Sequence, residues 1–447
     1  MSFRVTAQCT LSYQTYASRL NVIKNKRIKM TGNIEGSSAA ASKEGGAKAA
    51  GGQTTARRKA GITDTGTVVD FRRSLPPAVP MLGPLLSAAF HSLEEHCNLS
   101  ELMHGSVARG SDAERSAGAR LLAPRLGPIR DLNRVTPTNG TQSALLILIK
   151  HLVSEGRVLF AEELTYGALK AIAKLAGVTL RGLPIDQDGI LPGPFEAVCK
   201  SGIAGALYCN PTIQNPTTAI MSEARRRDLA RIAQRFGVPI IEDDALGRLH
   251  PGATQPIARL APDICWYLMT TSKCLAHGLR LAYLVSPSKK ARDSALRLVE
   301  NLSFWNATPL STGIMTQWTN TDAANVISSA IHDENAAREA YARSRLGKLG
   351  LVSKPASMHA WLPLPEGWPA LQFVEHAETL GVLVRPAQLF ASDDAPVNVP
   401  NAVRLSLSTP GSREAAEEGI DRICALLDEK VGPTGRPGKV SQQIDRA

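Results

Sequence analysis

The sequence lacks any long apolar run and any paired-cysteine motif. No hydrophobic stretch in the 447 residues approaches the ~20 residues that a transmembrane helix needs. The seven cysteines are scattered, several of them in apolar runs, and none forms a Cys-x-x-Cys pair. This argues against a disulfide framework and favours reduced thiols in a cytoplasmic protein. His91, His96 and Cys97 do not have the ligand spacing of a zinc site, so no metal is expected.

The excess of positive charge is concentrated at the N-terminus. The formal net charge is +11, and residues 1–60 hold eleven Lys or Arg but only two Glu. Because nine of the eleven net charges lie there, the rest of the chain is nearly neutral, and nucleic-acid binding by the globular part is not expected. A chain of 447 residues is long enough for a large core and two domains. Its 43% apolar and 20% charged residues are ordinary for a globular protein.

The first 66 residues are predicted to form a disordered basic tail. Residues 33–55 are dominated by Gly, Ala, Ser and Lys, which bury too little apolar surface to offset the entropy of ordering. Two interpretations stay open for residues 1–29: translation starts at Met30, or the stretch is an organelle-targeting peptide. No periodic helices of a winged helix-turn-helix are visible in this segment.

Strands alternate with helices through the middle of the chain. Predicted strands lie at 157–161, 178–184, 205–209, 238–244 and 264–269, and predicted helices at 144–153, 169–176 and 222–236. This alternation implies right-handed crossovers and a mainly parallel sheet covered by helices on both faces, an α/β fold. Residues 287–305 are predicted to begin a long helical segment that continues through 310–349.

A lysine stands directly after the apolar run at 264–269. Lys273 follows three hydroxyl residues, 270–272, and Arg280 comes seven positions later. A lysine whose pKa is lowered by burial or by cationic neighbours can form a Schiff base with an aldehyde. Hydroxyls and a planar guanidinium suit a phosphate. Aldehyde and phosphate together indicate pyridoxal 5′-phosphate (PLP), although a surface lysine would show the same short pattern.

Other candidate residues also follow predicted strands. A glycine turn, Asn139-Gly140-Thr141-Gln142, opens the helix predicted at 144–153, and free amides at a helix start bind phosphate. An ordinary Ser/Thr-capped turn is an equally good explanation of this turn. In parallel sheets, binding sites gather at the carboxyl ends of the strands. The candidates in such positions are Thr141, Tyr166, Asn215, Asp243 and Lys273.

Three motifs occur in the order typical of one superfamily. They are Gln214-Asn215-Pro216-Thr217, Ile241-Glu242-Asp243-Asp244, and Ser272-Lys273 with Gly278-Leu279-Arg280. Over residues 67–430 the chain resembles the fold-type I PLP enzymes, the class I/II aminotransferase superfamily. Within that superfamily it is similar to the aminotransferase-like domain of MocR regulators and to aminoadipate and kynurenine aminotransferases.

The resemblance implies how the cofactor ring would be held. Lys273 would carry the Schiff base and shuttle the α-proton, and Asp243 would pair with the pyridine nitrogen. Asn215 would hydrogen-bond the ring oxygen and contact the substrate, and Tyr166 would stack on the ring. Each residue has a structural alternative: Asp243 could cap a helix, Asn215 could fix an Asn-Pro turn, and Tyr166 could be a half-buried surface aromatic.

The resemblance also implies where the anionic groups would bind. Arg404 would bind the substrate α-carboxylate through a bidentate guanidinium, or else it is an exposed strand arginine. The phosphate would be held by Thr141, Gln142, Thr270 and Arg280.

The resemblance further implies the domain organisation. The large PLP-binding domain would be accompanied by a smaller α+β domain built from both chain ends. The expected segments are a tail (1–66), the N-terminal segment of the small domain (67–130), the large domain (131–305), the C-terminal small domain (306–430) and a second tail (431–447).

The predicted function is a PLP-dependent aminotransferase that acts on an α-amino acid and a 2-oxo acid, as a homodimer. The chain departs from the family pattern at Ala245, Thr218 and His277, where tyrosine, glycine and proline are usual. A tyrosine usual before Gly110 is also not visible. Because the missing tyrosine at 245 would change how the cofactor is tuned, a PLP-dependent decarboxylase, lyase or oxidase stays an alternative. A MocR-like sensor domain without catalysis is another.

Overall fold

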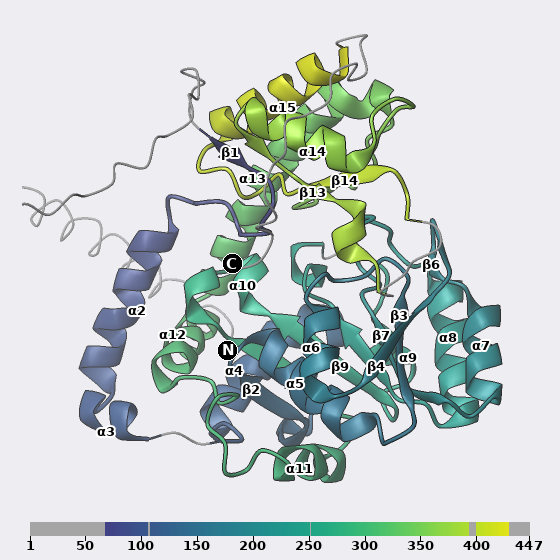
Figure 1. Ribbon diagram of the computed structural model, residues 1–447. Helices are drawn as coiled ribbons and strands as arrows, with labels where there is room; N and C mark the ends of the chain where they lie inside the picture. Colours follow the sequence, from purple (N-terminus) through teal and green to yellow (C-terminus); the bar gives the residue numbers. More distant parts are fainter. Residues whose placement is uncertain (1–67, 106–107, 251, 393–398, 429–447) are drawn as a thin grey trace, which may run out of the picture. The chain divides into compact units, whose positions relative to one another are not determined.

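The computed structural model describes residues 68–105, 108–250, 252–392 and 399–428, and it contains a seven-stranded sheet (Figure 1). Its strands, in spatial order, are β2 (Val135–Thr138), β10 (Ala282–Val285), β9 (Cys265–Thr270), β8 (Ile240–Asp243), β7 (Ala204–Cys209), β3 (Val158–Glu162) and β4 (Thr179–Leu183). The five strands from β9 to β4 are parallel, and β10 runs antiparallel to both of its neighbours. The predicted mainly parallel sheet is therefore confirmed.

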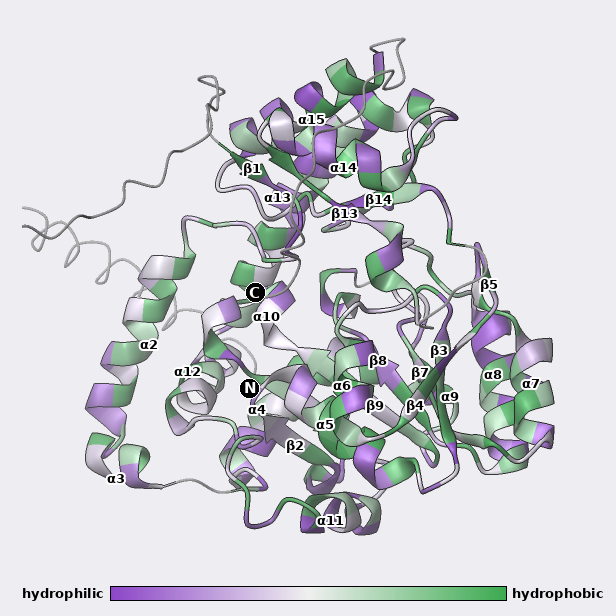
Figure 2. Cartoon of the chain, viewed as in Figure 1, coloured by the Kyte–Doolittle hydropathy of each residue, from purple (hydrophilic) through white to green (hydrophobic). Residues whose placement is uncertain are grey.

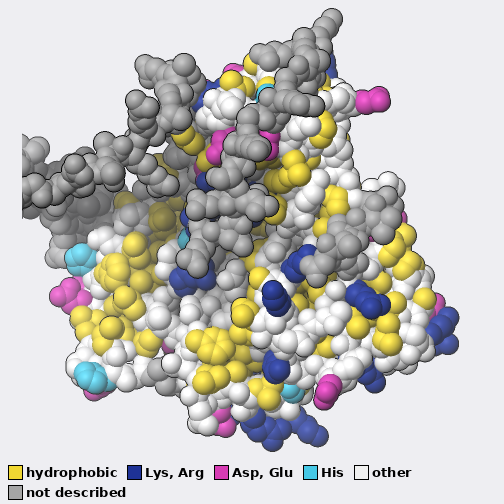
Figure 3. Space-filling model, viewed as in Figure 1, with side chains coloured by type: hydrophobic (Ala, Val, Ile, Leu, Met, Phe, Trp, Pro, Cys, Tyr) yellow, Lys and Arg dark blue, Asp and Glu magenta, His cyan; other side chains and the backbone are white. Residues whose placement is uncertain are grey.

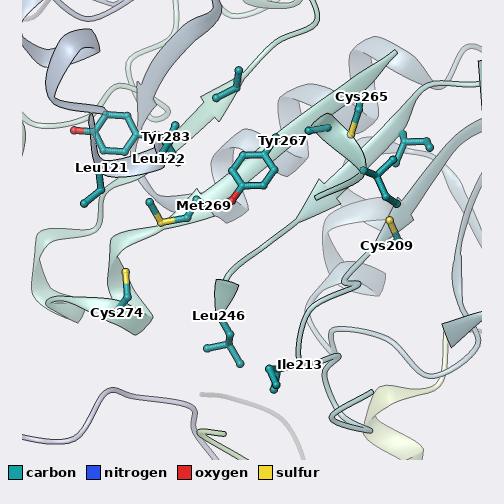
Figure 4. Close-up of a cluster of buried hydrophobic side chains, with 14 of the residues drawn as sticks. Leu121, Leu122, Cys209, Ile213, Leu246, Cys265, Tyr267, Met269, Cys274 and Tyr283 are labelled. Carbon is teal, nitrogen blue, oxygen red and sulfur yellow. The ribbon is translucent and has the colours of Figure 1, made fainter. Parts of the chain in front are cut away.

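Helices cover both faces of this sheet, because its central strands are buried on both sides. On β9, Trp266 and Leu268 belong to the core under α5 (Gly140–Leu152), α6 (Leu169–Ala176) and α11 (Lys289–Arg297). Cys265, Tyr267 and Met269 alternate with them and point into the opposite core (Figure 4). That core is covered by α4 (Asp112–Leu126), α7 (Pro192–Lys200), α8 (Glu223–Phe236) and α12 (Pro309–Asn320). In Figure 2, α7 and α8 show hydrophobic and hydrophilic residues on the same helix, as amphipathic helices do.

A smaller α+β part is built from both ends of the described chain. Near its start, β1 (Val69–Asp70) pairs in parallel with β12 (Val382–Leu383). A three-stranded antiparallel sheet has the order β11 (Ala360–Pro363), β14 (Ala402–Leu405), β13 (Arg385–Pro386). The long α13 (Ala323–Leu346), α14 (Ala370–Thr379) and α15 (Arg413–Asp428) contribute to the same core. The predicted fold class is confirmed, while the domain boundaries at residues 130 and 305 stay predictions.

The prediction of a long helical segment from residue 287 is wrong in its extent, because residues 298–308 form no helix. Helix α11 ends at Arg297, and the next helix, α12, begins only at Pro309. Proline disfavours a helical conformation at the residue before it, and Thr308 is extended there (ψ 139°) and caps α12 through its side chain. A small antiparallel hairpin, β5 (Ile185–Asp186) and β6 (Gly189–Ile190), follows β4.

No helix within the described ranges is both long and apolar enough to span a membrane. The described part contains six cysteines, and all six are free thiols. The predicted tails at 1–66 and 431–447 lie outside the described residues.

Candidate active site

A cavity of about 570 Å³ is lined by loops that follow the carboxyl ends of β2, β3, β7, β8 and β9, together with residues of the smaller part. All nine residues predicted for the site line it: Thr141, Gln142, Tyr166, Asn215, Asp243, Thr270, Lys273, Arg280 and Arg404. The structure therefore brings together side chains that are up to 263 positions apart in the sequence (141 to 404). Their individual roles stay predictions.

Lys273 lies on a single helical turn, α10 (Thr271–Cys274), which begins where β9 ends. Thr270 caps this turn by accepting a 3.1 Å hydrogen bond from the amide of Ser272. The Lys273 ammonium donates to the carbonyl of Ser74, a residue of the N-terminal segment. Burial, followed by the positive charge of Arg404, lowers the pKa of Lys273 to about 8. A usable fraction of the side chain is therefore a neutral amine near neutral pH.

Asp243 ends β8 and is buried, with 5% of its surface exposed. Its Oδ2 accepts a 2.9 Å hydrogen bond from the hydroxyl of Tyr208, whereas Oδ1 has no partner among the described residues. Burial raises the pKa of Asp243 to about 6, and the bond from Tyr208 opposes that rise. A buried carboxylate oxygen without a donor is costly unless a ligand supplies one.

Asn210 connects Asp243 to Asn215, and it was not predicted as a site residue. Its amide nitrogen Nδ2 donates to the main-chain carbonyl of Asp243, and its Oδ1 accepts a 2.9 Å bond from the amide of Asn215. The main-chain N–H of Asn210 donates to Oε1 of the fully buried Glu162 at 2.6 Å. The only sequence signal was the Asn210-Pro211 step at the end of a strand, which is also typical of an ordinary turn.

The N-terminus of α5 contributes Gly140, Thr141 and Gln142 to the cavity lining. Gly140 has a left-handed backbone (φ +74°), and a Cβ added there would lie 3.6 Å from Nη2 of Arg280. Asn139, the N-cap residue, does not cap the helix with its side chain, which donates instead to the carbonyl of Phe304 at 3.1 Å. Helix amides without a side-chain cap, beside a guanidinium, are groups that can bind an anion. Gln142, predicted to hold the phosphate, donates to the Tyr166 hydroxyl at 2.9 Å.

Arg404 lies on β14 and lines the same cavity. Its Nη1 donates to Oδ1 of Asn215 at 2.9 Å, and its Nη2 donates to the carbonyl of Arg72 at 2.6 Å. The guanidinium also lies over the ring of Phe390, 4.9 Å from the centroid. No carboxylate in the described part forms an ion pair with Arg404, and burial lowers its pKa to about 9.

Several residues that line the cavity were not predicted, because no motif surrounds them in the sequence. Arg72, Arg73 and Ser74 come from the segment after β1, His359 directly precedes β11, and Arg385 lies on β13. The pairing of β1 with β12 brings the N-terminal segment to this place, and its carbonyls at Arg72 and Ser74 accept bonds from Arg404 and Lys273 there. Ala245 lines the cavity at the position where the family usually has a tyrosine. Among the described residues, no cluster of His, Cys, Asp or Glu could hold a metal ion.

Comparison with known proteins identifies the family. The family model for aminotransferase class I and II matches residues 104–423. The chain is 26% identical to the uncharacterized HTH-type transcriptional regulator YdeF of Bacillus subtilis, over 71% of this chain and 67% of that protein. It is 24% identical to aromatic-amino-acid aminotransferase 1 of Thermococcus litoralis, over 83% of this chain and 90% of that one.

A solved structure shows the same fold. The kynurenine aminotransferase of Pyrococcus horikoshii, crystallised in complex with PMP, superposes with a TM-score of 0.72 at 21% identity, covering 82% of this chain and 92% of that one. The chain spans only 56% to 67% of the length of three B. subtilis regulators that it matches. Since the family model covers most of its length, the chain belongs to the aminotransferase class I and II family.

Proposed function

We propose that this protein is a PLP-dependent aminotransferase that moves an amino group between an α-amino acid and a 2-oxo acid. One observation carries the proposal: Lys273, with a pKa lowered to about 8, lines the same cavity as the carboxylate of Asp243, whose Oδ1 lacks a partner among the described residues. The family membership and the likeness to named aminotransferases support it.

The cavity residues fit PLP in three places. The free Oδ1 of Asp243 suits a protonated pyridine nitrogen, because a buried carboxylate without a donor gains most from a cationic one. The uncapped start of α5 with Arg280 suits the phosphate. Lys273 supplies the amine that an aldehyde requires.

PLP, when bound, supplies an electrophilic aldehyde and a ring that accepts electrons from the substrate. Lys273 then takes the α-proton from one carbon and returns it to another, which its lowered pKa permits near neutral pH. Asp243 keeps a proton on the ring nitrogen, and Tyr208 orients that carboxylate. Arg404 would bind the α-carboxylate, and Asn215, whose Oδ1 accepts a bond from Arg404, would donate its amide N–H to the ring oxygen.

Product analysis tests the reaction type. The purified chain, saturated with PLP, is incubated with a panel of amino acids with and without a 2-oxo acid. We expect sustained formation of the new oxo acid only when the 2-oxo acid acceptor is present. Turnover without an acceptor, with release of carbon dioxide, ammonia or hydrogen peroxide, would contradict transamination and favour the decarboxylase, lyase or oxidase that Ala245 in place of tyrosine suggests.

A second candidate is a PLP-binding sensor domain of a transcriptional regulator, which the likeness to YdeF favours. A sensor of this kind would bind PLP and an amino acid without multiple turnovers. A gel-shift experiment with the full chain on genomic DNA fragments distinguishes the two. Specific DNA binding together with no turnover would establish the sensor and contradict the enzyme.

We also propose a homodimer in the cytoplasm. Helices α2 (Leu82–His96) and α3 (Leu99–His104) expose three large apolar side chains: Phe90 (44%), Leu99 (44%) and Met103 (68%). Figure 3 shows hydrophobic side chains gathered over α2, and such patches mark protein contacts. Light scattering should give twice the chain mass for the wild type and a monomer for Phe90→Glu with Met103→Glu. The free thiols support the cytoplasmic location.

A further inference from the structure

Arg385 lies directly across from Arg404 in the small sheet. The two are Cα partners on the antiparallel strands β13 and β14, and both side chains line the cavity. The Nε of Arg385 donates to the carbonyl of Arg72 at 2.9 Å, and Arg404 donates to the same oxygen. Like charges directly opposite on neighbouring strands destabilise a sheet. This arrangement therefore costs stability unless a ligand brings negative charge.

Within the described residues, no carboxylate forms an ion pair with Arg385 or Arg404. Arg385 forms no ion pair there, and its terminal nitrogens have no hydrogen-bond partner among the described residues. Arg72, by contrast, forms an ion pair: its guanidinium donates to the carboxylate of Asp70 over 3.0 and 3.1 Å. Partial burial and the charges of Arg72 and Arg73 lower the pKa of Arg385, and the more distant carboxylate of Asp70 opposes this shift without reversing it.

The positive charges around the cavity outnumber the negative charges that the chain, the cofactor and the α-carboxylate supply. Six Lys or Arg side chains line the cavity, against the single carboxylate of Asp243: Arg72, Arg73, Lys273, Arg280, Arg385 and Arg404. Asp70 neutralises Arg72 from outside the cavity lining. A phosphate carries close to two negative charges, and a substrate α-carboxylate adds one. With PLP bound, the amine of Lys273 would be taken up by the aldehyde and the charge of Asp243 by the ring proton, so five arginines remain. The phosphate, the α-carboxylate and Asp70 supply four negative charges to these five arginines, one too few.

We infer that Arg385 forms a second anion subsite, and that the substrate is an α-amino acid whose side chain carries a second acidic group. The inference rests on the proposed function, because it takes Arg404 as the site of the α-carboxylate. A carboxylate on Arg385 receives charge-assisted hydrogen bonds from nitrogens that have no other partner. A neutral side chain there leaves the guanidinium unpaired, which disfavours its binding.

The first experiment uses the wild-type chain loaded with PLP. The half-reaction is followed by absorbance with L-glutamate against L-glutamine and L-aspartate against L-asparagine, pairs in which a neutral amide replaces the carboxylate at nearly the same shape. We expect at least one acid to exceed its amide in kcat/KM by about 100-fold. If the cofactor band forms and neither acid exceeds its amide, the inference is overturned while the proposed function stands. If no cofactor band forms, both fail.

Substitutions assign the effect to Arg385. Arg385→Gln should lower kcat/KM for the preferred acid by about 100-fold and leave its amide within about threefold, whereas Arg385→Lys should retain part of the preference for the acid. The control, Arg231→Gln, removes an exposed arginine on α8 and should change neither value. The thermal midpoint of Arg385→Gln should stay equal or rise, because a like-charge pair is lost. Equal loss for acid and amide would show a purely structural role and overturn the inference.

Discussion

The hydroxyl of Tyr208 donates a 2.9 Å hydrogen bond to Oδ2 of Asp243. This bond occupies one carboxylate oxygen and leaves Oδ1 without a partner among the described residues, in a side chain that lines the cavity. Because Tyr208 and Asp243 lie on the neighbouring strands β7 and β8, the sheet itself sets the direction of the free oxygen. The carboxylate is thereby oriented before any cofactor binds.

Replacement of Asp243 separates its charge from its shape. Asp243→Asn should lower kcat/KM by about 100-fold, because the charge that holds the ring proton is lost. Tyr208→Phe removes only the orienting bond, worth about 1 kcal/mol, and should cost between about three- and tenfold. Steady-state kinetics with PLP-saturated variants measures both effects. Equal activity of Asp243→Asn and the wild type would contradict the assigned pairing.

The rate at which the chain captures PLP should rise with pH. Only the neutral amine of Lys273 attacks an aldehyde, and burial with Arg404 lowers its pKa to about 8. The rate should therefore fall about tenfold per pH unit below 8 and reach a plateau above it. Arg404→Gln removes a cation that favours the neutral amine, so its midpoint should move to higher pH. Stopped-flow absorbance measures the profile, and a midpoint that is unmoved in Arg404→Gln would contradict this electrostatic coupling.

The fold could be predicted from the sequence because apolar runs and helical periodicity are local signals. The predicted helix at residues 169–176 coincides with α6, and the predicted strand at 205–209 differs from β7 by one residue. The helix predicted at 287–305 ends already at Arg297, and the continuation predicted at 310–349 is divided into α12 and α13, because Asp322 adopts a left-handed conformation between them (φ +62°). Strand β10 was missed, although four buried residues form it.

Residues of the site could be predicted only where they belong to a sequence motif. Asp243 and Lys273 stand beside strands and within recognisable patterns, and the structure brings them to one cavity. Arg73 and Arg385 reach the same cavity through the pairing of β1 with β12 and of β13 with β14. Such long-range pairing leaves no local trace in the sequence, so no spacing could have indicated these arginines.

Asn210 should matter more for activity than an asparagine with similar bonds elsewhere. Asn210→Ala removes the bonds to the Asp243 carbonyl and the Asn215 amide, and should destabilise the chain by about 1–3 kcal/mol and lower kcat. In the control Asn401→Ala, two bonds to the main chain at Ala370 and Trp368 are lost. The control should lose stability and keep its kcat. Kinetics combined with urea unfolding separates the two effects, and an unchanged kcat in Asn210→Ala would exclude a positioning role.

Gly118 is expected to tolerate no side chain. A Cβ at this position of α4 would lie 2.4 Å from two ring carbons of the fully buried Tyr283. Overpacking of this kind costs about 1–3 kcal/mol and outweighs the gain in helix propensity of up to about 1 kcal/mol. Gly83→Ala in α2 is the matched control, since a Cβ there meets nothing within 4 Å, and it should leave stability equal or higher. Denaturant unfolding in which Gly118→Ala equals the wild type would refute this packing argument.

The absorption spectrum of the purified chain tests the central claim most directly. After PLP is added and the unbound excess is dialysed away, the wild type should keep a band near the visible that shifts when an amino acid is added. Lys273→Ala should lose this band, whereas the control Lys289→Ala, on the exposed start of α11, should keep it. A wild-type protein that is colourless after dialysis, or a band that persists unchanged in Lys273→Ala, would contradict covalent capture of PLP at Lys273.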